Sequence, residues 1–204
     1  MVSSRMPEPR VVLASASPRR RELLELIGIP YTAVPADIDE SIIDGETAGV
    51  LAERLAREKA SVVAQRYPDA FVIAADTVVV LDGRIMGKPR TEAEAFEMLS
   101  ALSDATHTVF TDMACAFDAR IVSAIDEVSV TFRSLSDVEL HAYIETGEPM
   151  DKAGAYGIQG FGATLVERID GDYFAVMGLS LVRLVDVMKQ LGVEYRFGGG
   201  IQSG

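Results

Sequence analysis

The segment FVIAADTVVVL, residues 71–81, constrains the fold more than any other part of the chain. It is apolar and rich in β-branched residues, which is typical of a buried strand. Asp76 and Thr77 interrupt it, and the Asp82-Gly83 pair that follows predicts a hairpin turn. A lone carboxylate is costly to bury unless a cation or a metal ion meets it. We therefore interpret Asp76 as a functional residue rather than a structural one.

A second constraint is the junction between a short apolar strand, residues 10–14, and a helix that begins at Pro18. Ser17 is a natural N-cap for this helix. Arg19 and Arg20 lie in its first turn, where positive charge opposes the helix dipole. Backbone N–H groups at a helix start bind anions, so a phosphate shared with these arginines explains their position. A solvated helix start that happens to be basic is the alternative.

The remaining pattern predicts a mixed sheet in one α/β domain. Alternation predicts paired antiparallel strands in residues 107–119 and 120–135, and a further strand pair is expected around Asp170-Gly171. Helical spacing and capping residues predict helices at 47–66, 91–102, 136–145 and 179–192. We expect one domain over residues 1–196, splayed into two lobes, and a disordered tail over residues 197–204.

Charge and composition exclude several classes of protein. The 19 basic and 31 acidic residues give a formal charge of −12, which opposes binding to nucleic acid polymers and to anionic membranes. An anionic ligand therefore needs a local cluster of cations. Cys115 is the single cysteine, and residues 1–10 contain no apolar stretch of the signal-peptide type. We expect a cytoplasmic protein.

Lysines and acidic residues supply further candidates for chemistry. Lys88 and Lys152 lie in glycine-containing segments that let backbone approach a ligand closely. Lys59 is another candidate cation, although an exposed helix face explains it equally well. The loop DIDE, residues 37–40, offers carboxylates that together with Asp76 suit Mg²⁺, which typically binds one or two carboxylates plus substrate phosphates.

Familiar nucleotide and metal motifs do not match. The stretch GRIMGKP has the wrong glycine spacing for a phosphate loop, and Pro89 replaces the required hydroxyl residue. The stretch GIQGFG lacks the order of a dinucleotide fingerprint. His107 and His141 lie far apart without zinc-type partners, so we interpret both as structural.

Six ordered stretches share their residues with one known family, namely LASASPRRRELL, DIDE, LAREKA, AADTVVVLDGRIMGKP, YIETGEPMDKAGAYGIQG and GLSLVRL. Over residues 10–191 the chain resembles the Maf family of nucleoside triphosphate pyrophosphatases. The resemblance implies cleavage of dTTP or UTP, and of modified pyrimidine nucleotides, between the α and β phosphates. It also implies a divalent cation, Mg²⁺ first, with Mn²⁺ and Co²⁺ as alternatives. The implied fold is an elongated α/β structure with a central cleft, like that of inosine-triphosphate pyrophosphatases.

The resemblance also implies a role for each matching residue. Asp76 is expected as the catalytic residue, either as general base or as metal ligand, and Glu40 as a second metal-associated carboxylate. The positions expected to bind phosphate are Ser17, Arg19, Lys59 and Lys88, and those expected to tune base choice are Arg20, Thr77 and Gln159. Ser180 and Met86 depart from the usual proline and leucine, and we interpret both as packing changes.

Two other functions stay open at this point. A non-catalytic nucleotide-binding regulator of cell division would keep the cations but would not need Asp76. A pyrophosphatase for non-standard purine triphosphates would share the phosphate site, but the residues around Gln159 argue against it. The expected partners are a nucleoside triphosphate and, for assembly, a second copy of the chain in a homodimer.

Overall fold

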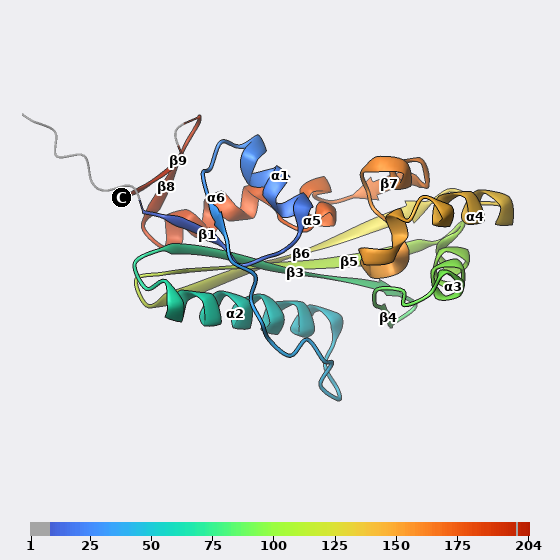
Figure 1. The fold of residues 1–204 in the computed structure, drawn as a ribbon, viewed down its shortest axis with the longest axis horizontal. Coiled ribbons are helices and arrows are strands. Elements are labelled where there is room, and N and C mark those ends of the chain that lie inside the picture. Colours follow the sequence, from blue (N-terminus) through green and yellow to red (C-terminus); the bar gives the residue numbers. More distant parts are fainter. Residues whose placement is uncertain (1–8, 199) are drawn as a thin grey trace, which may run out of the picture.

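A mixed seven-stranded sheet runs along the long axis of the molecule in the computed structural model, which describes residues 9–198 and 200–204 (Figure 1). The strand order is β2-β1-β3-β5-β6-β7, and β4 pairs with β3 outside this path. Strand β1 is parallel to both neighbours, whereas the other pairs are antiparallel. The strands are β1 (Val11–Leu13), β2 (Thr32–Ala33), β3 (Phe71–Leu81), β4 (Arg84–Met86), β5 (Thr106–Phe117), β6 (Arg120–Phe132) and β7 (Val166–Asp170).

Helices cover both faces of this sheet (Figure 1). They are α1 (Pro18–Leu26), α2 (Ala48–Arg66), α3 (Glu92–Leu102), α4 (Asp137–Glu145), α5 (Tyr173–Met177) and α6 (Leu181–Gln190), with 3₁₀ turns η1 (Glu148–Asp151), η2 (Ala153–Ala155) and η3 (Gly160–Thr164). Helix α2 lies along one face, while α1, α5 and α6 lie on the other, with α1 and α6 toward the β1 end and α5 near the middle. The predicted mixed α/β fold is confirmed.

The apolar core consists of separate clusters, and two of them lie at opposite ends of the long sheet. One cluster joins α1 and α6 to the β1 end of the sheet, and includes Leu24, Ile73 and Leu184. Another joins α3 and α4 to the far end, and includes Leu99 and Leu140. Strands β3 and β5 contribute to both clusters, so the long strands connect the two ends. The described residues contain no helix that is long and apolar enough to cross a membrane.

The strand pair predicted around Asp170-Gly171 is wrong. Strand β7 ends at Asp170, and the chain then enters the short helix α5 instead of a second strand. Asp172 starts this helix, because its side chain accepts a hydrogen bond of 2.9 Å from the backbone N–H of Phe174. An Asp-Gly pair suits a hairpin turn, but here the following aspartate acts as a helix N-cap.

The prediction of a disordered tail over residues 197–204 is also wrong for its described part. Strand β9 (Gly200–Ser203) pairs antiparallel with β8 (Val193–Arg196) in a small second sheet. Ile201 is 3% exposed and belongs to the core cluster under α1 and α6. Gly200 has a φ of +74°, which glycine adopts without the strain of a side chain.

Candidate active site

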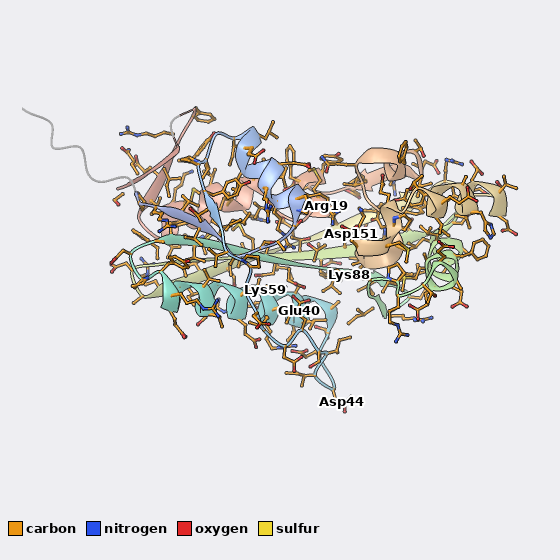
Figure 2. All side chains as sticks on the ribbon, in the orientation of Figure 1. Arg19, Glu40, Asp44, Lys59, Lys88 and Asp151 are labelled. Carbon is orange, nitrogen blue, oxygen red and sulfur yellow. The ribbon has the colours of Figure 1, made fainter. Side chains whose placement is uncertain are left out.

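All the predicted site residues except Gln159 line one cavity of about 590 Å³. The predicted residues that line it are Ser17, Arg19, Arg20, Glu40, Lys59, Asp76, Thr77 and Lys88. Figure 2 shows Arg19, Lys59 and Lys88 coming from separate elements toward the middle of the molecule. Gln159 does not line the cavity, although its neighbour Ile158 does. Residues that are widely spaced along the chain therefore share one site, and Gln159 lies beside it.

Lys59 forms ion pairs with two carboxylates that also line the cavity. Its Nζ lies 2.7 Å from Asp76 Oδ1 and 2.5 Å from Glu40 Oε1. Lys59 is only 7% exposed, although it comes from the long helix α2. The alternative of an exposed helix face for Lys59 is therefore wrong. The ammonium group compensates the carboxylate that interrupts the apolar strand β3, as a buried charge requires.

Glu40 reaches Lys59 from a loop that is anchored by a residue the sequence did not single out. Arg54 of α2 donates hydrogen bonds to the Glu46 carboxylate and, at 2.9 Å, to the Ser41 carbonyl. Burial alone would raise the pKa of Glu40, yet the hydrogen bond and charge of Lys59, together with the charges of Lys88 and Arg20, hold that pKa below its ordinary value. Glu40 is therefore ionised at neutral pH.

Helix α1 presents its first turn to the cavity. Ser17 lies at the N-cap position with extended backbone, but its side chain makes no capping hydrogen bond. Instead, the Oγ of Ser15 accepts a 3.2 Å hydrogen bond from the Ser17 N–H. Pro18 occupies the first helical position and lines the cavity together with Arg19. The helix start thus offers both its dipole and a guanidinium to an anion.

Arg20 has a structural role that its place in the sequence did not reveal. Its Nε donates to the Gly178 carbonyl at 2.8 Å, and its terminal nitrogens donate to Ser15 Oγ at 3.1 Å and Thr77 Oγ1 at 3.3 Å. Burial lowers the pKa of Arg20, and the Asp76 charge opposes that change. Arg20 therefore ties α1, β3 and the turn after α5 together at the cavity wall.

Asp112 is a buried acid that the sequence analysis missed. It lies opposite Asp76 in the register of β3 and β5, and it is 1% exposed. Its Oδ1 has no hydrogen-bond partner among the described residues. Burial, and then the charge of Glu53, raises the pKa of Asp112 to about 7. The sequence contained a signal for Asp112, because this residue interrupts an apolar strand as Asp76 does.

The glycine-rich segment, residues 152–162, forms another wall of the cavity through Lys152, Ala153 and residues 156–158. Lys152, which was predicted to meet a ligand, lines the cavity; its Nζ lies 2.6 Å from Asp151 Oδ1 and also donates to the Glu148 carbonyl. His107 Nε2 lies 2.7 Å from the Tyr156 hydroxyl, and burial lowers the pKa of His107 to about 4. His107 is therefore a neutral core residue, in agreement with its structural interpretation.

The donor set fits a divalent cation in part. Within residues 9–198 and 200–204 no three acidic, histidine or cysteine side chains converge as a preformed metal site. Glu40 and Asp76 nevertheless point at one position, the Lys59 ammonium. Mg²⁺ commonly takes one or two carboxylates and completes its shell with substrate phosphate oxygens. Two convergent carboxylates next to a cationic cavity match that chemistry.

The fold and this cavity define a class, namely α/β proteins with a cationic cleft beside an aspartate of the central strand β3. The sequence matches the model of the Maf-like protein family over residues 10–191, and the chain belongs to this family. A dTTP/UTP pyrophosphatase of Halalkalibacterium halodurans is 46% identical over 187 residues, which cover 92% of this chain and 98% of the relative. Another of the same name, from Syntrophomonas wolfei, is 50% identical and covers 89% and 97%. A HAM1 protein structure from Coxiella burnetii shares the fold, with a TM-score of 0.51, 19% identity and coverage of 89% and 99%.

Proposed function

We propose that this protein hydrolyses dTTP or UTP, and modified pyrimidine triphosphates, to the monophosphate and pyrophosphate. The observation that carries the proposal is the ion pair of Asp76 with Lys59 inside a cavity that Arg19 and Lys88 also line. Curated relatives that cover most of the chain bear the name dTTP/UTP pyrophosphatase, which supports the choice of substrate. A cell-division regulator that only binds nucleotide would not need a carboxylate in this position.

The cationic side chains that line the cavity bind the triphosphate in this proposal. Arg19, Lys59 and Lys88 bring positive charge into the cavity from α1, α2 and the segment after β4. In phosphoryl transfer, positioning and charge neutralisation supply most of the catalysis. Cations close to the β and γ phosphates stabilise the negative charge that develops on the leaving pyrophosphate. Ser17 and the start of α1 add donors for a phosphate oxygen.

Asp76 is the general base in this proposal. Its carboxylate lines the cavity and lies 2.7 Å from the Lys59 Nζ, so Asp76 is placed to accept a proton from a water molecule that attacks the α phosphorus. The new bond joins the water oxygen to the α phosphorus, and the bond between that phosphorus and the bridging oxygen breaks. Pyrophosphate then leaves with the electron pair of that bond. A divalent cation, when bound by Glu40 and Asp76, would supply further neutralisation of phosphate charge.

A comparison of Asp76→Asn with the unaltered protein tests the proposal. Release of pyrophosphate from a panel of normal and modified nucleoside triphosphates is measured with Mg²⁺, Mn²⁺ or Co²⁺ and after addition of a chelator. We expect turnover of dTTP and UTP that needs a cation and that falls at least about 100-fold in the variant, while circular dichroism stays unchanged. Binding of dTTP without turnover by the unaltered protein would favour the regulator. A preference for deaminated purines would favour the alternative enzyme.

The cytoplasmic location and the homodimer stay predictions. The expectation of a cytoplasmic location rests on the single cysteine of the chain. Sedimentation of the purified chain and fractionation of cells would measure them.

A further inference from the structure

A carboxylate behind the glycine-rich wall of the cavity is bound by three donors. Glu148, at the start of η1, accepts hydrogen bonds from the Tyr143 hydroxyl at 2.8 Å, the Phe161 N–H at 2.9 Å and the Gly162 N–H at 3.0 Å. Burial would raise the pKa of Glu148, but these donors hold it below its ordinary value. The carboxylate is therefore ionised, and each of its hydrogen bonds is charge-assisted.

Tyr143 extends this network to the cavity wall. Its hydroxyl, which donates to Glu148, also accepts a 3.2 Å hydrogen bond from the Gly157 N–H. Tyr143 is 5% exposed and belongs to α4, so its ring is fixed by the core. Gly157 and its neighbours Tyr156 and Ile158 line the cavity. The hydroxyl thus links an ionised carboxylate outside the cavity to backbone that faces a ligand inside it.

The glycines of this segment are packed tightly around the network. A Cβ on Gly160 would lie 2.5 Å from Glu148 Oε2, and one on Gly162 would lie 2.7 Å from the Tyr143 hydroxyl and 2.2 Å from the Gly157 carbonyl. Contacts below 3 Å force the surroundings to shift, so glycine is needed at both positions. The backbone of this segment is therefore packed closely against Glu148 and Tyr143.

We propose that Tyr143 and Glu148 are positioning residues that hold the wall from Gly157 to Ile158 in the form that contacts the nucleoside end of the substrate. This inference rests on the proposed function. Arg19, Lys59 and Lys88 provide the charge for the phosphates, whereas this wall offers backbone groups and the apolar Ile158. A base needs such donors, acceptors and apolar surface. Neither positioning residue takes part in the attack on phosphorus.

The expected consequence is a change in affinity without a change in chemistry. When a binding-competent form is populated only in part, the apparent dissociation constant rises by the inverse of that fraction. Removing the Tyr143 hydroxyl deletes one hydrogen bond to a charged group and one to the Gly157 amide. For bonds of this kind we expect a rise of about tenfold in KM for dTTP, with kcat within about twofold of its original value.

Tyr143→Phe is the first test, and inorganic pyrophosphate is the probe of the phosphate end. Its inhibition constant is measured with that variant and with the unaltered protein, alongside KM and kcat for dTTP. We expect the inhibition constant to stay unchanged while KM rises, since pyrophosphate has no base. General damage to the fold would weaken both ligands. Glu148→Gln, which removes the charge but keeps the size, is expected to raise KM further.

Tyr31→Phe is a matched control. The Tyr31 hydroxyl also donates to a carboxylate, Glu25 Oε1, at 2.8 Å, but neither residue lines the cavity. We expect its kinetic constants to equal those of the unaltered protein. A folded Tyr143→Phe protein with an unchanged KM for dTTP, or with an equal rise in the inhibition constant of pyrophosphate, overturns the inference. An unaltered protein that hydrolyses no nucleoside triphosphate instead refutes the proposed function, and the inference with it.

Discussion

Replacement of Lys59 by methionine would test how Asp76 is tolerated inside the sheet. Methionine keeps most of the length and volume of the side chain but removes the ammonium that lies 2.7 Å from Asp76 Oδ1. The Asp76 side chain is 13% exposed, so it would remain as a nearly buried charge without a partner. Removing one partner of a buried pair typically costs about 3–5 kcal/mol.

The second partner of Lys59 contributes little to this loss. The Glu40 side chain is 54% exposed, so water can solvate its carboxylate once Lys59 is gone, as at surface ion pairs worth roughly 0–1 kcal/mol. We therefore expect Lys59→Met to lower the free energy of unfolding by about 3 kcal/mol. For a chain of this length that corresponds to a fall in Tm of about 6–12 °C.

Urea unfolding followed by circular dichroism, with a chelator present, would measure the loss. The double variant Lys59→Met/Asp76→Asn separates charge from packing, because it removes the unpaired carboxylate. We expect the second substitution to restore about 2 kcal/mol. Lys189→Met is a suitable control, since Lys189 is 66% exposed and lies 3.9 Å from Asp186. A double variant no more stable than Lys59→Met alone would refute our explanation of the buried pair.

Two further predictions concern Asp112 and the residues assigned to base choice. Because burial and then Glu53 raise the pKa of Asp112 to about 7, the folded protein holds a proton that the unfolded chain releases near pH 4, so stability should fall as pH rises from about 4 to 7. Asp112→Asn should remove this fall and raise the free energy of unfolding by about 2 kcal/mol at pH 8, as measured by urea unfolding at about pH 5 and 8. The same change in stability between the two pH values in both proteins would contradict this prediction. Arg20→Ala and Gln159→Ala should each change the order of preference among nucleoside triphosphates, and a pyrophosphate-release panel with an unchanged order would remove that residue from base selection.

The sequence alone determined most of the local structure. The apolar β-branched run predicted β3, and the capping sequences TEAE and SDVE predicted the starts of α3 and α4, where Thr91 and Ser136 accept capping hydrogen bonds. These features depend on neighbours a few residues apart, so periodicity and capping chemistry suffice to predict them. The same local reasoning failed at Asp170-Gly171, where two local preferences competed, and in the tail, where strand β9 forms by pairing with β8.

Only the tertiary structure decided which charges meet. The rotation of α2 against the sheet turns Lys59 inward, and the register of β3 with β5 places Asp112 opposite Asp76. Gln159 lies outside the cavity that its neighbour Ile158 lines. Such relations depend on packing between elements that are distant in sequence, where a rotation or a one-residue shift in register changes every contact. The residue types of the site could thus be predicted from the sequence, whereas their pairing could not.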